Sequence, residues 1–174
     1  MPQLIKDRAV TADTWALLRT AATLADLPEN GSVIVPLQLW TQHRVTLSAR
    51  GNVGVLLAPA DDPAALVEDI ATIPLIAVDF PQFTDGRGYS TARLLREKYA
   101  FKGELRAVGD VLRDQLYYLA ASGFNAFALR PERDLNDAIK AFDDFSDNYQ
   151  STVAQPRPHF HRREAFAGNR AKGQ

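Results

Sequence analysis

The run Pro74-Leu75-Ile76-Ala77-Val78-Asp79-Phe80 decides the fold class of this chain. Its apolar residues are continuous rather than alternating, which is typical of a strand that is buried on both faces in a parallel sheet. Pro81 ends the run, because proline has no amide donor for a sheet ladder. Similar short apolar runs begin near residues 33, 53, 104 and 126. The chain is therefore expected to form about five buried strands of a mostly parallel sheet.

A helical segment is expected after each strand. Asp61-Asp62-Pro63 joins an acidic cap to a first-turn proline, and Ser90 and Asp110 are placed to cap two further helices. Strand–helix alternation implies right-handed crossovers. The pattern predicts an α/β fold of about five β-α units, and it fits both an open doubly wound sheet and part of a β/α barrel. Residues 4–10 can add an edge strand.

The chain of 174 residues is expected to form one domain over residues 1–153, followed by a flexible C-terminal tail over residues 154–174. The tail is basic, although the whole chain has a net charge of −1. Its charged residues are Arg157, Arg162, Arg163, Arg170, Lys172 and Glu164. A basic tail on an acidic body favours docking onto an acidic protein partner over nucleic-acid binding. The uncovered sheet edges are also compatible with a homodimer.

The absence of cysteine excludes disulfides, a thiolate nucleophile and a cysteine-bound iron–sulfur cluster. No dinucleotide fingerprint, phosphate loop or nucleophile elbow is present, so no cofactor is evident. His43 has no paired ligand in the sequence and His159-x-His161 lies in the tail, so no metal site is expected. The N-terminus has no apolar run of signal-peptide length, and no stretch approaches 18 apolar residues. A cytoplasmic protein without membrane contact is expected.

Ligands of parallel α/β sheets bind beyond the carboxyl ends of the strands, which points to the loop over residues 81–90. Two glycines, a base and the start of a helix there favour an anion. Asp79 ends an apolar strand, and a buried carboxylate needs a partner, for which Arg106 is the natural candidate. These side chains are equally compatible with turns, caps and surface ion pairs. The candidate anion- or ligand-binding residues are Asp79, Asp85, Arg87, Tyr89, Ser90, Arg93, Arg106, Asp110 and Arg113.

The segments over residues 78–96 and 103–116 resemble a bacterial family of unknown function, and the resemblance extends over residues 1–153. They include Asp85-Gly86-Arg87-Gly88-Tyr89-Ser90 and Val108-Gly109-Asp110-Val111-Leu112-Arg113-Asp114. Members commonly carry the label of an oxidoreductase of sulfite reduction, which rests on neighbouring genes. Relatives have Arg-Cys where this chain has Ala121-Ser122, so redox chemistry at that thiol is not available here.

The resemblance implies an accessory protein of assimilatory sulfite reduction in the cytoplasm. Such a protein would be a partner of the sulfite reductase haemoprotein without established chemistry of its own. The arginine-rich loop favours a second hypothesis, a protein or enzyme that binds a small oxyanion such as sulfite, sulfate or a phosphosulfate. A flavin- or nicotinamide-dependent oxidoreductase is a third hypothesis, which rests on the fold class alone.

Overall fold

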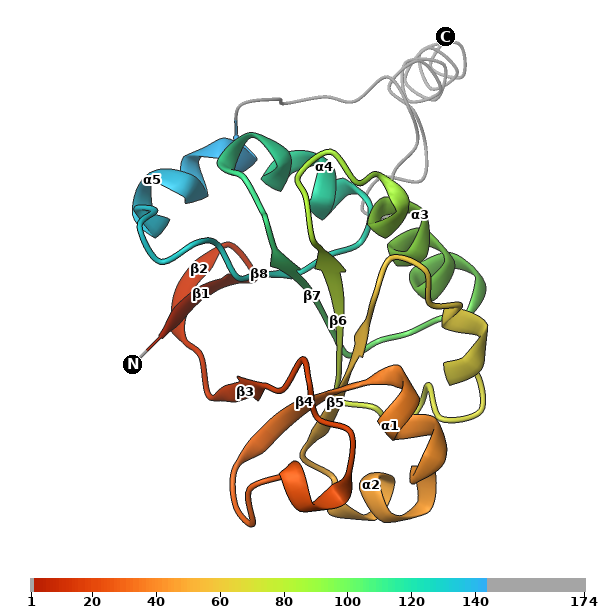
Figure 1. Cartoon of the computed structure of the whole chain (residues 1–174). Coiled ribbons are helices and arrows are strands. Elements are labelled where there is room, and N and C mark those ends of the chain that lie inside the picture. The colour runs from red at the N-terminus through yellow and green to blue at the C-terminus, as the bar shows by residue number, and fades with distance from the viewer. Residues whose placement is uncertain (1, 144–174) are drawn as a thin grey trace, which may run out of the picture.

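A computed structural model of the chain describes residues 2–143, which form one curled sheet with helices outside it (Figure 1). The sheet has eight strands in the order β2-β1-β8-β7-β6-β5-β4-β3. The strands are β1 (Gln3–Lys6), β2 (Ala9–Ala12), β3 (Trp15–Leu17), β4 (Ser32–Pro36), β5 (Val53–Leu57), β6 (Leu75–Phe80), β7 (Glu104–Gly109) and β8 (Ala126–Phe127).

The five predicted strands correspond to β4 to β8, and the predicted first residue of each is confirmed to within one residue. Neighbouring strands from β3 to β8 are parallel and follow one another in chain order. A doubly wound sheet reverses its order at a switch point. The unreversed order and the curl therefore favour the barrel-like alternative over the open sheet. The N-terminal segment forms a hairpin, in which β1 is antiparallel to both β2 and β8 and only β2 lies at the edge.

The helices within residues 2–143 pack on the convex face of the sheet (Figure 1). They are α1 (Leu37–Gln42), α2 (Arg44–Arg50), α3 (Arg87–Arg93), α4 (Leu116–Ala121) and α5 (Leu135–Ile139). Alternate strand residues such as Val55, Val78 and Ala107 face these helices and form the main core. A smaller cluster on the concave face includes Ile34, Leu56 and Ala77. The strands are therefore buried on both faces, as their continuous apolar runs predict.

Three predicted helix starts are corrected by the structure. Asp62 does cap a turn through the amide of Ala64, but that segment is only a 3-10 turn over Pro63–Leu66. Ser90 is an exposed residue inside α3 rather than its cap, because the helix already begins at Arg87. Asp110 does not cap a helix, since the next helical turn begins at Arg113 and Asp110 has other partners.

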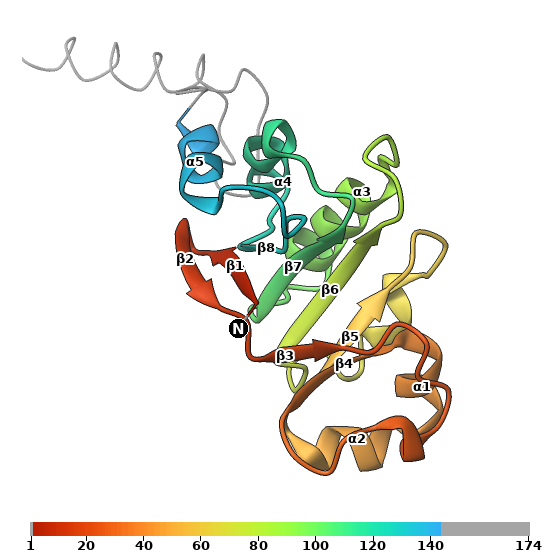
Figure 2. The ribbon, with the colours of Figure 1, turned by 60° about the vertical axis from the view of Figure 1, so that its left-hand side comes forward.

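On the concave face of the sheet, a chain of charges links β1 and β7 to the connection between β2 and β3. Lys6 Nζ lies 2.8 Å from Glu104 Oε2, and Glu104 Oε1 accepts from Arg106 Nε at 2.8 Å. Arg106 then donates to both oxygens of Asp13, at 2.9 and 3.0 Å. Asp13 lies in the connection that runs from β2 at one edge to β3 at the other, which Figure 2 shows in red. These side-chain contacts therefore attach the β2–β3 connection to β7 on the concave face of the sheet.

No helix among residues 2–143 has both the length and the apolar character needed to cross a membrane. The predicted tail over residues 154–174, with His159 and His161, lies outside the described residues.

Candidate functional site

Two aspartates lie beside one glycine where β6 and β7 end. Gly109 has a φ of 98°, a conformation that favours glycine, and a β-carbon there would clash with the Phe80 carbonyl oxygen. The same β-carbon would lie 2.8 Å from Asp79 Oδ1. The amide of Asp110 donates to the Phe80 carbonyl at 2.7 Å. Asp79 and Asp110 are therefore held close together at the carboxyl end of the sheet.

The partner of Asp79 is Arg19, from the loop after β3, with Arg19 NH1 2.6 Å from Asp79 Oδ1. The prediction that Arg106 pairs with Asp79 is wrong. Arg106 does lie on the neighbouring strand and on the same face, but it is opposite Ala77. Its guanidinium is occupied by Glu104, two residues earlier on its own strand, and by Asp13.

The partner of Asp110 is Arg130, from the loop after β8, with a distance of 2.6 Å between Arg130 NH2 and Asp110 Oδ1. Asp110 Oδ2 also accepts from the amide of Phe83 at 3.2 Å. This aspartate therefore ties together the loops that follow β6, β7 and β8.

The two ion pairs share a pattern of a sheltered acid and an accessible base. The side chains of Asp79 and Asp110 are each 15% exposed, whereas those of Arg19 and Arg130 are 42% and 48% exposed. Each carboxylate contacts one nitrogen of its guanidinium, while the other nitrogens remain able to donate. The site therefore presents two arginines to solvent, each beside a sheltered acid.

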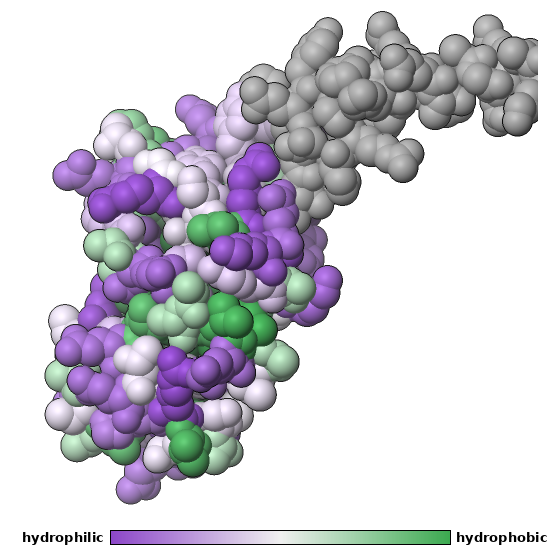
Figure 3. Space-filling view, turned by 90° about the vertical axis from the view of Figure 1, so that its right-hand side faces the viewer, coloured by the Kyte–Doolittle hydropathy of each residue, from purple (hydrophilic) through white to green (hydrophobic). Residues whose placement is uncertain are grey.

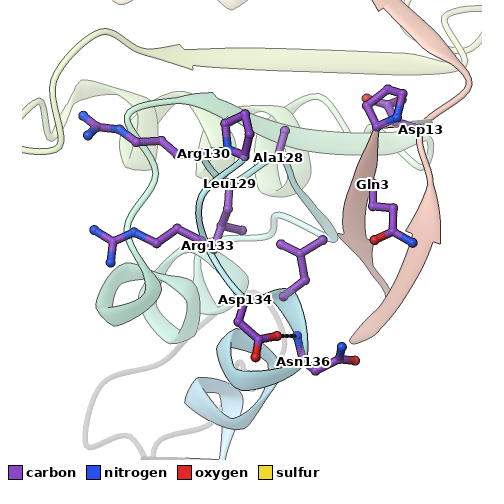
Figure 4. Close-up of a pocket in the computed structure, with 11 residues that line it drawn as sticks. Gln3, Asp13, Ala128, Leu129, Arg130, Arg133, Asp134 and Asn136 are labelled. Atoms are coloured by element: carbon purple, nitrogen blue, oxygen red, sulfur yellow. Dashed lines mark hydrogen bonds between the residues drawn. The ribbon is translucent and has the colours of Figure 1, made fainter.

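Each of these arginines borders a hollow in the surface. Arg19 lines two small hollows, one of about 350 Å³ among residues 17–21 and Asp26, and one of about 270 Å³ beside Pro36 and Gln38. Arg130 lines a larger pocket of about 520 Å³ between the segment after β8 and the N-terminal hairpin (Figure 4). The carboxyl end of the sheet thus offers space next to both bases.

The predicted anion loop is arranged differently. Arg87 donates to Asp85 through Nε at 3.0 Å and NH2 at 2.8 Å, and its backbone amide donates to the same carboxylate at 3.1 Å. These hydrogen bonds from Arg87 lower the pKa of Asp85 below its ordinary value and raise the pKa of Arg87. The guanidinium is therefore already engaged by an acid within its own loop.

The remaining candidates lie around α3 and α4. Tyr89 packs edge-on against Phe80, with 5.7 Å between the ring centroids. Burial raises the pKa of Tyr89, and this effect is larger than that of a hydrogen bond with Gln115, which lowers the pKa. Arg93 lies 3.7 Å from Glu97, one turn along the helix. Arg113 Nε lies 3.2 Å from Asp137. Of the nine candidates, the structure places Asp79 and Asp110 at neighbouring strand ends, and Arg106 lies on the concave face, opposite Ala77 of β6.

Sequence reasoning missed Arg19 and Arg130, although both follow strand ends. Arg130 comes directly after the predicted fifth strand, so the carboxyl-end rule could have selected it. Arg19 had no such signal, because β3 has only three residues and was not predicted. No group of three or more potential ligands among the described residues could hold a metal ion.

The profile of a family described as "Bacterial protein of unknown function (DUF934)" matches residues 54–160. The chain belongs to this family. The matched region holds Asp79, Asp110 and Arg130, whereas Arg19 lies before it. Neither curated proteins nor solved structures give a match. Ser122 is 4% exposed, and its hydroxyl donates to the Tyr118 carbonyl.

Proposed function

We propose that this protein binds a small oxyanion at the carboxyl end of its sheet, through Arg19 and Arg130. The observation that carries the proposal is that both arginines are half-exposed, while the acids that orient them are sheltered. Guanidinium groups recognise tetrahedral and planar oxyanions by pairs of parallel hydrogen bonds. One nitrogen of each guanidinium contacts the aspartate, and the other nitrogens can donate hydrogen bonds to a ligand.

The resemblance to a family linked with sulfite reduction suggests sulfite, sulfate or a phosphosulfate as the ligand. Asp79 and Asp110 offset part of the positive charge, so the affinity for a bare ion is expected to be modest. What they contribute is orientation, because a fixed guanidinium loses less side-chain entropy when the ligand binds.

Calorimetric titration of sulfite, sulfate and phosphate against the wild type and two variants tests the proposal. Arg19→Ala and Arg130→Ala are each expected to weaken binding at least tenfold, about 1.4 kcal/mol. Arg130→Lys should restore only part of the loss, because lysine keeps the charge but not the fork. Lys102→Ala is the matched control, since it removes an exposed positive charge just before β7, at the opposite end of that strand. No binding to the wild type at millimolar concentration, or equal loss in Lys102→Ala, contradicts the proposal.

A second candidate function is that of a partner of the sulfite reductase haemoprotein, and an apolar surface patch favours it. Figure 3 shows this patch, surrounded by hydrophilic residues, on the side of the molecule where α3 and the β5–β6 connection lie. Val67 of that connection is 43% exposed and Leu94, at the end of α3, is 40% exposed. Exposed apolar patches with a polar rim are typical of protein–protein contacts.

Co-purification with the haemoprotein tests this second function. The double variant Val67→Ser and Leu94→Ser is expected to abolish the association. Val45→Ser is the control, because Val45 is 86% exposed but lies on α2. If the double variant still co-purifies with the haemoprotein, or if the wild type does not co-purify at low salt, the patch is not a binding surface for the haemoprotein.

A further inference from the structure

The sequence contains one asparagine that is followed by glycine, Asn30-Gly31, and it lies in the loop directly before β4. Both residues are exposed. Among residues 2–143, neither the Asn30 side chain nor the Gly31 amide has a hydrogen-bond partner. A β-carbon at Gly31 would meet nothing within 4 Å. The side-chain amide of Asn30 and the backbone nitrogen that follows it are therefore both accessible for reaction with each other.

The hydrogen bonds of this loop fall on its carbonyl groups instead. Arg50 NH2 donates to the carbonyl of Pro28 at 2.8 Å and to that of Gly31 at 3.1 Å. Asn52 Nδ2 donates to the same Gly31 carbonyl at 2.6 Å. A nearby positive charge favours the anionic form of a group that loses a proton. The Arg50 guanidinium therefore favours deprotonation of the Gly31 amide.

The other asparagines of the described residues lack this arrangement. Each is followed by a residue with a β-carbon, which hinders approach of the next amide to the side chain. They are Asn52, Asn125 and Asn136. The side chains of Asn52 and Asn125 are engaged in hydrogen bonds. Asn136 is exposed, but the next amide, that of Asp137, donates to Asp134 at 3.3 Å.

Asp85-Gly86 places a second glycine after a side chain that could form a ring with the next amide. Ring closure by an aspartate expels water and needs the neutral acid, because a carboxylate is a poor electrophile. The hydrogen bonds from Arg87 lower the pKa of Asp85 and therefore keep it ionised. The structure thus distinguishes two sites that both precede a glycine.

We propose that Asn30 is a site of spontaneous deamidation. The Gly31 nitrogen gives up its proton and bonds to Cγ of Asn30, which closes a five-membered succinimide ring. The bond between Cγ and Nδ2 of Asn30 breaks, and the amide group leaves as ammonia with that proton. Water then adds across either C–N bond of the ring and yields aspartate or isoaspartate. The net reaction exchanges ammonia for water and needs no oxidant or reductant.

The two products are expected to differ in their effect on the fold. Aspartate leaves the backbone path unchanged. Isoaspartate adds one carbon atom to the main chain directly before β4, so the Gly31 carbonyl cannot keep both of its donors, Arg50 and Asn52. The isoaspartate form should therefore have a lower urea midpoint than the Asn30→Asp variant.

Incubation of the folded protein at mildly alkaline pH, followed by peptide mapping with mass spectrometry, tests the proposal. Asn30 is expected to deamidate at least ten times faster than Asn136, the exposed control in the same chain. Electron-transfer fragmentation should show isoaspartate at position 30 and none at Asp85. Gly31→Ala should slow the reaction at least fivefold, because its β-carbon hinders ring closure. Asn30→Gln should abolish it on the same timescale, since the longer side chain must close a six-membered ring.

Circular dichroism confirms that each variant is folded before incubation. Deamidation of Asn30 that is no faster than that of Asn136 overturns the proposal. An unchanged rate in Gly31→Ala, or aspartate without isoaspartate, also overturns it, because the amide is then lost by direct hydrolysis and not through a ring. These outcomes are independent of anion binding, which involves neither residue of the pair.

Discussion

Replacing Arg106 by alanine should destabilise the fold strongly, because this buried side chain ties β7 to the connection between β2 and β3. Arg106 is 3% exposed and donates to Glu104 and to both oxygens of Asp13. Without it, and among the residues that the structure describes, the Asp13 carboxylate keeps only the hydrogen bond from the Trp15 amide, and the Glu104 carboxylate keeps only the ion pair with Lys6. Removing one partner of a buried ion pair typically costs about 3 to 5 kcal/mol. Since a domain is stable by roughly 5 to 15 kcal/mol, Arg106→Ala should lose a large share.

Urea denaturation measures this loss, followed by far-ultraviolet circular dichroism and by tryptophan fluorescence. Trp15 lies next to the affected contact, so its emission should change in the folded variant as well. Arg93→Ala is the control, because Arg93 is 40% exposed in a surface pair with Glu97 and should cost less than about 1 kcal/mol.

A double-mutant cycle shows whether the effect comes from the contact with Asp13. Asp13→Asn should cost less in the Arg106→Ala background than in the wild type, by more than about 1 kcal/mol. A loss in Arg106→Ala no greater than in Arg93→Ala, or a coupling near zero, would refute the reasoning that the contact between Arg106 and Asp13 stabilises the fold.

Three further predictions concern single positions. Gly109→Ala should cost at least about 2 kcal/mol by chemical denaturation, because it adds a clash with Phe80 to a strained φ. Gly31→Ala, at a φ of 93° with open space around it, should cost less. Burial raises the pKa of Tyr89 above its ordinary value of about 10, so the stability that its neutral form contributes is complete below that pH and is lost as the pH rises through the folded value. Tyr89→Phe should therefore lose less stability than the wild type at alkaline pH, as measured by urea midpoints across that range. Ser122→Cys should change the melting temperature little, because the buried position needs only a small side chain; a large fall would show that the hydroxyl is required.

Part of the candidate site could be predicted because it depends on local signals. Asp79 ends an apolar run and Asp110 follows a strand and a glycine, so the carboxyl-end rule selects both. The role of the loop around Arg87 was harder to predict from the sequence, since the same residues are compatible with an anion site and with a local ion pair. The structure shows the pair with Asp85, which short-range hydrogen bonds favour whatever the rest of the fold does.

The sequence by itself determined the five buried strands of this protein, because an apolar run between turn residues is a local property. It also determined that no thiol takes part in any chemistry. Only the tertiary structure decided which bases meet Asp79 and Asp110. Arg19 and Arg130 come from loops far apart in the chain, and the curl of the sheet brings both to the end of β6 and β7. Ion pairs between distant segments depend on strand order and curvature, which no single stretch of sequence encodes.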